Sequence, residues 1–532
     1  VEDPVAMAWD EFGRLYVVEM RGFMPDAYGV GQEEPVGQVV RLTDTDGDGR
    51  MDTSEVFLDG LVNPRAVAVV NAGILIGEPP HLWLCVLPTP ESACTNKRSL
   101  GEYGLAEGDT SIEHLENGLL PGLDNWLLNA KSNREMRLVD GQLQVRTTVH
   151  RGQWGISKDN LGRVFYNNNS NFITADFIAA SDQASATGLT EAAGIGVVLT
   201  APEEVFSARV NPGVNRAYLD NTLREDGRLH HATAVSGLGV YRGDQFPERY
   251  RGNVFVPEPG ANVVAQFQLA EDGLELAAEH NLYADSTWGQ REFLASTDER
   301  FRPVDAFNGP DGALYILDMY RGIIQEQHFL TEELREQIFT RELDRPLGHG
   351  RIWRVVYTES KTERSATTLG DATSAELVAA LGADNGWVRD TAQRLLLQPQ
   401  HQPGAALGGW LQADNELGAV HALWTLAGRN ELTREQVLAA INAVADARQV
   451  QALRAGAELL AAADLQGLLE RDDLTAALQL QLAYAIEAQL EDPNIQQHWV
   501  QLSAAAADSE LLRQALVRSA STREFELLQA LL

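Results

Sequence analysis

Along the first two thirds of the chain, one pattern of apolar and polar positions recurs. An apolar stretch of strand length is followed by a turn that ends in Gly or, once, in Asn125, and then by a second apolar stretch. Gly and Asn tolerate the left-handed backbone of tight turns, and the Val, Ile and Tyr of the second stretches favour strands. The copies occupy residues 4–19, 64–78, 119–131, 153–168, 246–258 and 302–318. They predict an all-β, six-bladed β-propeller over residues 1–360, with residues 350–357 in the last blade and the N-terminal strand beside it.

After about residue 365 the apolar period changes to that of amphipathic helices rich in Ala and Leu, as in residues 374–398 and 434–464. The segment WVRDTAQRLLLQ (387–398) is similar to the second half of a HEAT repeat, in which a buried Asp and Arg bridge neighbouring repeats. Asp390 and Arg394 hold those positions here. We expect residues 366–532 to form an all-α, HEAT-like solenoid, which would offer a surface to a protein partner.

The segment DTDGDGRMDTSE (44–55) has the spacing of a calcium-binding EF-hand loop. Such a loop takes ligands from positions 1, 3, 5, 7, 9 and 12 and has Gly at position 6, which is Gly49 here. The predicted ligands are Asp44, Asp46, Asp48, the Arg50 carbonyl, Asp52 and Glu55. Because the flanking residues have the pattern of strands rather than of helices, we predict a structural Ca²⁺ between two strands. A solvated acidic turn is the alternative.

The overall charge limits the partners that the chain can have. Acidic residues outnumber basic ones by 76 to 42, and the formal net charge is −34. Nucleic acids and anionic membranes require a positive field, so both are disfavoured. The sequence has no apolar run of the length that spans a bilayer, so we expect no transmembrane segment.

Cys85 and Cys94 are the cysteines of the chain, at a spacing that suits the closure of a small loop. We predict a disulfide between them, which implies an oxidising compartment; two buried free thiols are the alternative. Neither begins a C-x-x-C-H motif, so this chain attaches no haem covalently. No signal peptide precedes the first strand pattern, and we expect one to have been removed from a periplasmic or extracellular protein.

The repeat places a polar residue at the end of the second stretch of every copy. These residues are Glu19, Glu78, Lys131, Asn168, Glu258 and Asp318, and Arg321 follows the last of them. Strand ends are polar wherever they meet water, but that alone does not explain repeated carboxylates with Lys and Arg among them. We predict that this ring surrounds one mouth of the channel, where it would bind a polyhydroxylated or quinone-like ligand.

The residues that enter each first stretch should face the same mouth, and they include Arg65, Gln153, Trp154 and Arg302. Nearby in sequence, His150 stands beside Arg151, and a His next to an Arg at a mouth is suited to accept a proton from a substrate hydroxyl. An ordinary loop histidine is an equally good interpretation of His150.

His230 and His231 offer a second source of a base, or metal ligands. Adjacent residues on a strand point to opposite faces, so at most one of them is expected to enter the site. We take His231 as the candidate.

Several segments resemble a bacterial family of membrane-bound dehydrogenases: residues 44–61, 241–264, 291–322 and 350–355. Its members join a six-bladed propeller of the glucose/sorbosone dehydrogenase type to HEAT-like repeats, often with a cytochrome c domain. More distantly, the chain is similar to soluble sugar dehydrogenases that use pyrroloquinoline quinone (PQQ) and calcium. The resemblance implies that His150 is the base, and that Lys131, Arg302 and Arg321 contact the anionic quinone. Further cofactor contacts would come from Arg151, Asn168, Glu258 and Asp318.

Three functions agree with these features. The first is a calcium-containing, quinoprotein-like dehydrogenase that oxidises a sugar or a sugar-derived alcohol or aldehyde and passes electrons to a cytochrome c. The second is a polysaccharide lyase or hydrolase with His150 or His231 as base and Tyr320 as acid, in which Arg302 would neutralise a uronate. The third is a non-catalytic scaffold that binds glycans or proteins. A quinone requirement, unsaturated products, or binding without turnover would distinguish them.

Overall fold

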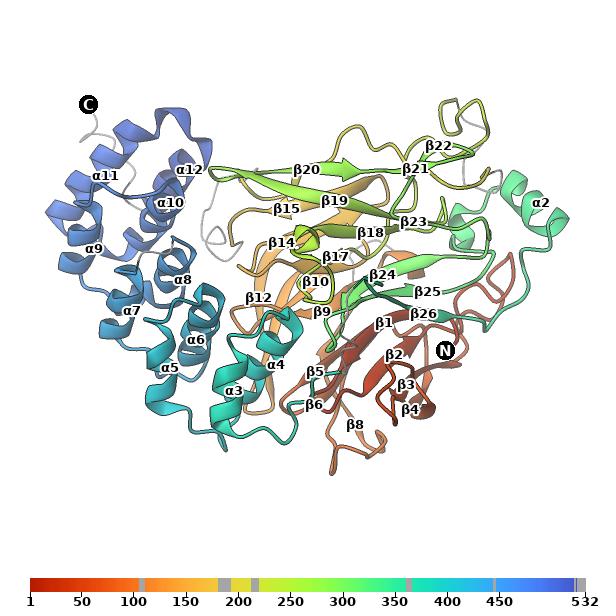
Figure 1. The fold of residues 1–532 in the computed structure, drawn as a ribbon, viewed down its shortest axis with the longest axis horizontal. Helices are drawn as coiled ribbons and strands as arrows, with labels where there is room; N and C mark the ends of the chain where they lie inside the picture. The colour runs from red at the N-terminus through yellow and green to blue at the C-terminus, as the bar shows by residue number, and fades with distance from the viewer. Residues whose placement is uncertain are drawn as a thin grey trace.

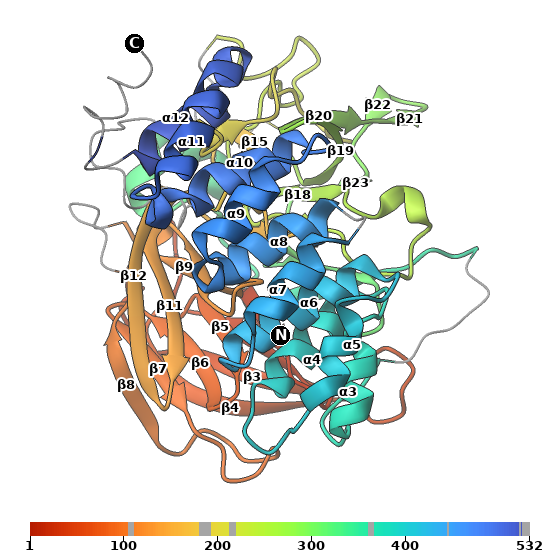
Figure 2. The same ribbon diagram turned by 90° about the vertical axis from the view of Figure 1, so that its left-hand side faces the viewer.

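The computed structural model describes residues 1–104, 111–179, 193–211, 220–359, 366–443, 446–520 and 523. A mostly β-sheet region is followed by a helical region, as predicted, and the two lie side by side (Figure 1). Figure 2 shows the helices stacked against one side of the β region. None of the described helices is both long and apolar enough to cross a bilayer.

The β region is built from antiparallel units in chain order. The strands are β1 (Pro4–Trp9), β2 (Leu15–Glu19), β3 (Gly37–Thr43) and β4 (Thr53–Leu61); β5 (Ala66–Val70), β6 (Gly73–Glu78), β7 (His81–Cys85) and β8 (Lys97–Glu102); β9 (Asn117–Pro121), β10 (Leu127–Ala130), β11 (Ser132–Val139) and β12 (Gln142–Arg151); β13 (Ile156–Lys158), β14 (Val164–Asn168), β15 (Asn171–Asp176) and β16 (Val197–Val198); β17 (Gly239–Val240), β18 (Val254–Glu258), β19 (Val263–Asp272), β20 (Glu275–Asn281) and β23 (Leu294–Ala295); the hairpin β21 (Tyr283–Asp285) and β22 (Gly289–Arg291); and β24 (Pro303–Asn308), β25 (Leu314–Asp318) and β26 (Arg351–Val355).

The first strands of these units surround a central channel in a propeller-like arrangement. β1, β5, β9, β13, β17 and β24 contact one another in this order, and β1 also contacts β24. A glycine permits the closest approach: a Cβ on Gly155, whose φ is +77°, would lie 2.2 Å from the Cα of Gly237. Strand β26 pairs with β25 in the last unit, as predicted. The N-terminal strand β1 lies beside this unit, where it contacts β24 and β25.

The predicted hairpin at 246–258 is wrong in its first half. Residues Glu248–Tyr250 form a short 3-10 helix, η2, and the first strand of this unit is β17, further upstream. The physical reason lies in Tyr241, whose hydroxyl accepts hydrogen bonds from the backbone N–H groups of Gln245 (3.1 Å) and Phe246 (2.8 Å). These donors are therefore engaged by a side chain rather than by a neighbouring strand.

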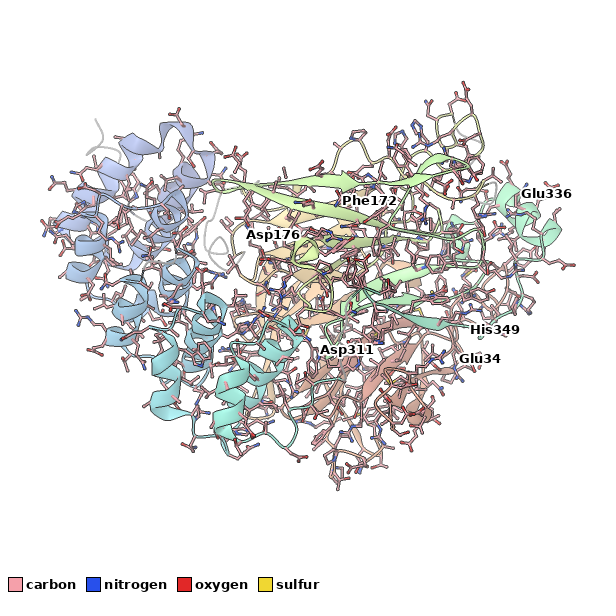
Figure 3. The ribbon with its side chains drawn as sticks, in the orientation of Figure 1. Glu34, Phe172, Asp176, Asp311, Glu336 and His349 are labelled. Carbon is pink, nitrogen blue, oxygen red and sulfur yellow. A yellow bond between two sulfur atoms is a disulfide. The ribbon has the colours of Figure 1, made fainter. Side chains whose placement is uncertain are left out.

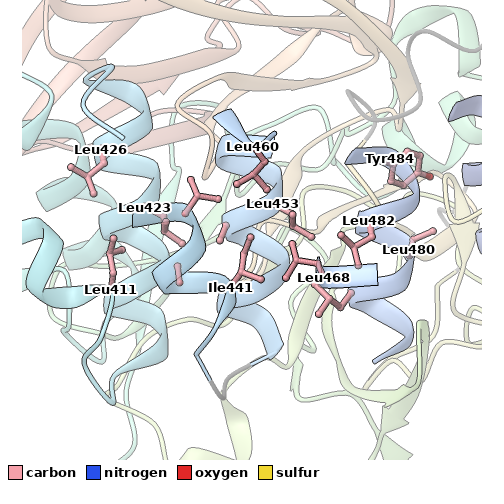
Figure 4. Close-up of a cluster of buried hydrophobic side chains, with 14 of the residues drawn as sticks. Leu411, Leu423, Leu426, Ile441, Leu453, Leu460, Leu468, Leu480, Leu482 and Tyr484 are labelled. Carbon is pink, nitrogen blue, oxygen red and sulfur yellow. The ribbon is translucent and has the colours of Figure 1, made fainter. Parts of the chain in front are cut away.

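The helical region contains α3 (Ser374–Ala380), α4 (Gly386–Leu396), α5 (Gly404–Trp410), α6 (Glu416–Gly428), α7 (Arg434–Ile441), α8 (Asp446–Gly456), α9 (Ala462–Leu469), α10 (Ala476–Ala485), α11 (Pro493–Ala505) and α12 (Glu510–Ser519), with short 3-10 helices η4 (Ala457–Leu459), η5 (Glu487–Gln489) and η6 (Ala506–Asp508). Helices α4, α6, α8, α10 and α12 contact one another in a row, and α3, α5, α7 and α11 pack beside them. Their apolar faces share one core, to which Leu423, Leu453 and Leu482 belong (Figure 4).

Helix α4 docks on the end of the channel where the first strands finish. Asn385, at its N-terminus, donates to the carbonyls of Gly309 (3.1 Å) and Pro310 (3.2 Å). One turn further, Asp390 binds Arg242 through both guanidinium NH groups (2.7 and 3.0 Å). Helix α4 therefore covers this end, which we call the lower end of the channel.

The opposite end carries two further segments. Helix α2 (Glu332–Thr340) and the 3-10 helix η3 (Gln327–Phe329) lie in the connection between β25 and β26. In Figure 3, Glu336 on α2 lies on the side of the β region away from the helical region, as do Glu34 and His349. Arg335 on α2 donates to the carbonyl of Ala27 (3.2 Å), which joins this segment to the loop after β2.

The predicted disulfide between Cys85 and Cys94 is confirmed. It connects the end of β7 to the segment that precedes β8. Cys94 also donates its backbone N–H to the carbonyl of Phe57 (2.9 Å), so the closed loop is attached to the first unit of the β region.

Candidate functional site

A cavity of about 410 Å³ lies at the end of the channel where the first strands begin. Its wall includes Val5 and Val304 at the starts of β1 and β24, and Met20 and Met319 just after β2 and β25. The predicted mouth is thus a real hollow, and we call it the mouth cavity. Of the residues predicted to enter the first strands there, Gln153 and Trp154 line it.

The wall of the mouth cavity combines aliphatic and aromatic side chains with neutral polar ones. The aromatic residues are Phe23, Trp154 and Phe329. Neutral hydrogen-bonding groups come from Gln153, Asn169, Ser170, Thr222, Thr233 and Gln325. The titratable residues of the wall are Glu113 and His114; no Lys or Arg is among the described residues that line it.

His114 belongs to the 3-10 helix η1 (Ile112–His114), which precedes β9. Its ring centroid lies 5.1 Å from that of Phe329. Two contacts hold η1 in place: Arg65 donates to the carbonyl of Ile112 (2.6 Å), and the Glu113 carboxylate accepts the backbone N–H of Glu326 (3.0 Å). A buried guanidinium therefore fixes the helix that presents the histidine.

The carboxylates predicted to ring the mouth instead attach strands to loops. Glu19 accepts the N–H of Glu2 (2.9 Å), just before β1. Glu78 accepts the backbone N–H of Val62 (2.7 Å), which precedes β5. Asp318 accepts the backbone N–H of Arg302 (2.8 Å), which precedes β24. Glu258 is fully buried and accepts the N–H groups of Thr233 (3.0 Å) and Ala234 (2.9 Å), ahead of β17. In each of these units the carboxylate fastens the entry of the first strand.

The arginines predicted to contact a quinone are also buried. Arg302 donates to the carbonyls of Pro259 (2.5 Å), Arg321 (3.2 Å) and Gly322 (2.9 Å), and burial lowers its pKa to about 10. Arg321 donates to the carbonyl of Met24 (2.6 Å) and pairs with Asp3 (3.3 Å).

Arg151 is paired with two buried carboxylates. Its guanidinium contacts Glu135 (2.9 Å) and Asp176 (2.7 Å), and the latter residue is labelled in Figure 3. None of Arg151, Arg302 and Arg321 is among the residues that line the mouth cavity.

The remaining candidates lie apart from one another. His150 lies on β12 with much of its side chain exposed. Burial of the rest of the ring and the positive charge of Lys131 lower its pKa. Tyr320 donates its hydroxyl to Asp298 (2.8 Å), and Arg351 lies over its ring. Asn168 is exposed and accepts the N–H groups of Ser170 (2.9 Å) and Asn171 (3.1 Å).

His231 stacks on His230 with ring centroids 3.9 Å apart, and burial lowers its pKa. His230 contacts the carboxylate of Glu204 at 3.2 Å. Neither histidine is among the residues that line the mouth cavity. The structure therefore does not bring the predicted base, acid and quinone contacts together.

Residues 44–52 of the acidic segment form a turn between β3 and β4, as predicted, and residues 53–55 begin β4. Carboxylate oxygens of Asp44, Asp46 and Asp48 lie within 4.8 Å of one another. Asp44 accepts the N–H groups of Gly47 and Gly49, each at 2.8 Å, and both glycines have left-handed backbone, with φ of +78° and +84°.

The other predicted calcium ligands have different partners. Asp52 accepts hydrogen bonds from the N–H and hydroxyl of Thr45, each 2.6 Å, and Glu55 pairs with Arg41 (2.8 Å). The exposed Arg50 donates its backbone N–H to the carboxylate of Asp48 (2.7 Å).

A family model described as "Domain of unknown function (DUF7133)" matches residues 1–359. The chain belongs to this family. The match covers the whole described β region of this DUF7133 member. A search of curated proteins finds no match.

Several solved structures are similar to this chain at low identity. A Thermus thermophilus protein described as an oxidoreductase (glucose dehydrogenase) has 12% identity and a TM-score of 0.34, over 66% of this chain and 96% of its own. A calcium structure of a Trichoderma reesei carbohydrate-active enzyme of family AA12 has 14% identity and a TM-score of 0.31, over 61% of this chain and 90% of its own. A structure of virginiamycin B lyase from Staphylococcus aureus has 12% identity and a TM-score of 0.30, over 59% of this chain and 76% of its own. We draw nothing about substrate or cofactor from these likenesses.

Proposed function

We propose that the chain is a propeller enzyme that binds an uncharged sugar or sugar-derived alcohol in the mouth cavity, with His114 as general base. The observation that carries this proposal is the wall itself: neutral hydrogen-bonding groups, aliphatic side chains, three aromatic rings, Glu113 and a single histidine around about 410 Å³. Amides and hydroxyls are suited to pair with sugar hydroxyls, and the aromatic faces with the apolar faces of a sugar ring. Histidine is the side chain most often used to accept a proton near neutral pH.

PQQ fits this wall poorly. The quinone carries several carboxylates, which require cations or a dense set of donors, and no Lys or Arg is found among the described wall residues. Lys131, Arg302 and Arg321 lie outside the wall, and both arginines bind backbone carbonyls. We therefore derive no step through PQQ. Oxidation of the sugar, with electrons passed in the end to a cytochrome c, is the redox form of the proposal. Because it releases two electrons and two protons, it requires a bound two-electron acceptor other than PQQ ahead of the cytochrome.

An elimination reaction is the second candidate, because it uses the same base and no electron acceptor. A base beside a sugar can remove a proton from a carbon next to a carbonyl as well as from a hydroxyl. The absence of an arginine from the described wall disfavours a uronate as its substrate, in contrast to the lyase predicted from the sequence.

The test is turnover of a panel of neutral aldoses, sugar alcohols and ketosugars by the full chain. Dye reduction reports oxidation, and the absorbance of an unsaturated product reports elimination. We expect His114→Ala to lower kcat/KM by about 100-fold or more, and His150→Ala, the matched control, to leave it unchanged. If His150→Ala abolishes turnover and His114→Ala does not, the base is misassigned; if no neutral sugar binds, the function is wrong.

We also propose that the β region is a six-bladed propeller over residues 1–360 and that residues 366–532 form a HEAT-like solenoid for a protein partner. The closed order of contacts among the first strands supports the blades. The row of contacting helices α4, α6, α8, α10 and α12 supports the solenoid, although residues 524–532 lie outside the described chain.

We propose that Ca²⁺ binds the turn between β3 and β4. The three clustered carboxylates of Asp44, Asp46 and Asp48 fit a hard cation, which prefers oxygen ligands. The ion would hold like charges together at this turn. The disulfide supports a periplasmic or extracellular location, since disulfides persist in oxidising compartments.

A further inference from the structure

A second hollow lies at the lower end of the channel, beneath Trp154. A cavity of about 210 Å³ occupies this end, and a groove of about 1000 Å³ runs between the third unit of the β region and the helices. Lys158, Asp390 and Arg394 line both of them. The cavity therefore opens sideways into the groove, by a route separate from the mouth.

Basic residues outnumber acidic ones along this route, in contrast to the chain as a whole. The cavity is lined by Arg65, Lys158, Arg242 and Arg394 and by Asp305 and Asp390. The groove adds Arg137, Arg146, Arg429 and Arg454, and Asp124, Asp140 and Glu458. Arg137 and Arg146 lie over the ring of Trp126, at 4.5 and 4.3 Å from its centroid. These planar cations line the approach to the cavity.

The buried charges where cavity and groove meet are not balanced. Lys158 is 4% exposed, and its ammonium contacts one carboxylate oxygen, that of Asp390, at 3.2 Å. The same carboxylate serves the buried Arg242, so two cations share one anion. Arg389, also buried, donates to the carbonyls of Ala383 (2.6 Å) and Asp384 (3.0 Å), which are neutral.

Excess buried charge is costly unless an opposite charge accompanies it. The cost is visible in the pKa values: burial lowers that of Lys158 to about 8 and that of Arg389 to about 10. A bound anion would restore the balance. An ammonium has three donors, and the one contact to Asp390 leaves capacity for a further oxygen ligand.

We propose that the lower cavity is a second binding site, for a small anion with carboxylate, sulfate or phosphate oxygens, and that Lys158 is its central contact. The anion enters along the arginine-lined groove and binds the donors of the Lys158 ammonium that Asp390 does not use. Bound there, it is also close to α4, so its binding stabilises the contact between the β region and the helical region.

The test uses sulfate as the probe, because its charge does not change near neutral pH. We expect sulfate to raise the thermal unfolding temperature of the full chain in a saturable way, beyond a chloride control of equal ionic strength. Lys158→Met should weaken sulfate binding by about ten-fold or more, as expected for loss of a charged hydrogen bond. The matched control is Lys97→Met, since Lys97 likewise contacts one carboxylate, that of Glu78 at 3.6 Å, but lines neither the cavity nor the groove. An equal response in all three proteins would show salt exclusion only and overturn the proposal.

A second measurement keeps the proposal testable if Lys158→Met does not fold. The titratable groups that face Lys158 are Asp390, Arg242, Asp124 and His421, and burial lowers the pKa of His421 so that it is neutral in this pH range. Because the ammonium is charged below its pKa, sulfate affinity of the unmodified chain, measured by calorimetry, should fall as the pH rises from about 6.5 to 9.5. A pH-independent affinity would contradict the role of Lys158. Acetate and phosphate, titrated in parallel at pH 6.5, identify which oxyanion the site prefers. Failure here leaves the sugar-binding proposal for the mouth untouched, since that site is tested with His114→Ala.

Discussion

Asp305 shows how one buried side chain contributes to the response of the fold to pH. It lies on β24 and faces the lower cavity, and its carboxylate accepts the N–H of Ala306 (2.8 Å). The absence of a side chain at Gly237 makes room for the Asp305 carboxyl group, because a Cβ on Gly237 would lie 2.3 Å from the Asp305 carboxyl carbon. Burial raises its pKa well above the ordinary value. The folded protein therefore keeps a proton that the unfolded chain releases.

This predicts that Asp305 makes the protein less stable as the pH rises. A carboxyl with a raised pKa binds more protons in the folded state, so its contribution to stability is lost above the unfolded pKa near 3.8. Asp305→Asn should therefore reduce the loss of unfolding free energy between pH 5 and pH 8. Urea unfolding of both proteins at pH 5 and at pH 8 measures this loss of unfolding free energy. A larger pH dependence in Asp305→Asn than in the unmodified protein would contradict the assignment.

At the same scale, the repeated carboxylates explain why the sequence pattern pointed to the mouth but not to the base proposed here. Their period correctly marks the end of the channel where the second strands finish. The period itself, however, has a structural cause, since residues such as Glu258 fasten the backbone that enters each first strand. His114 lies in the connection before β9 and has no equivalent in other copies, so no periodicity could identify it.

Among the elements, the turn between β3 and β4 carries the clearest functional signal. Three carboxylates cluster there, and the N–H groups of Gly47 and Gly49 donate to Asp44. The spacing of the segment predicted both the cluster and the flanking strands. It did not predict that Glu55, which lies opposite Arg41 in the register of β3 and β4, would pair with that residue. Cross-strand pairing, which depends on register, decided its partner.

We predict that Ca²⁺ stabilises the chain through this turn. At a concentration about 100 times Kd, the ion should add about 2.7 kcal/mol to the unfolding free energy. Asp46→Ala should abolish this effect, because it removes one of the clustered carboxylates. Asp59→Ala is the control, since Asp59 is an exposed aspartate on β4 outside the cluster. Calorimetry with calcium or with a chelator measures the difference; equal stabilisation of both variants would place the ion elsewhere.

The strand pairs of most units were predicted from the alternation of apolar stretches and turns, because each hairpin is a local structure. The exception at 246–258 arises from a side chain: the hydroxyl of Tyr241 accepts the N–H groups that a strand would have used. The start of the helical region was likewise visible in the change of period, and α3 begins at Ser374. The docking of α4 on the channel could not be predicted, since it depends on contacts between residues far apart in sequence.

At the scale of the whole molecule, α4 covers the lower end of the channel, and the cavity there opens into the groove between the β region and the helices. A central contact of α4 is Asp390, which binds both Arg242 (2.7 Å) and Lys158 (3.2 Å). Burial alone would raise its pKa, but these two cations lower it far below the ordinary value. The contribution of this carboxylate to stability is thus present at neutral pH and is lost on strong acidification.

We predict that the β region and the helical region of the unmodified protein unfold together, and that Asp390→Ala separates them. Removing the shared carboxylate leaves the buried Lys158 and Arg242 without their anion, at a cost of about 3–5 kcal/mol. That loss falls on a contact between the two regions, because Asp390 lies on α4 whereas Lys158 and Arg242 belong to the β region. Calorimetry should therefore show one transition for the unmodified protein and two for the variant.

Asp384→Ala is the control: Asp384 is exposed and contacts Arg251 at 3.5 Å, so its loss should cost about 0–1 kcal/mol and leave a single transition. Two transitions already in the unmodified protein would show that α4 docks too weakly to couple the two regions. One transition in Asp390→Ala would assign the coupling to the other contacts between them, such as those of Asn385 and Gln393 and the ion pair of Arg394 with Glu11 (2.8 Å).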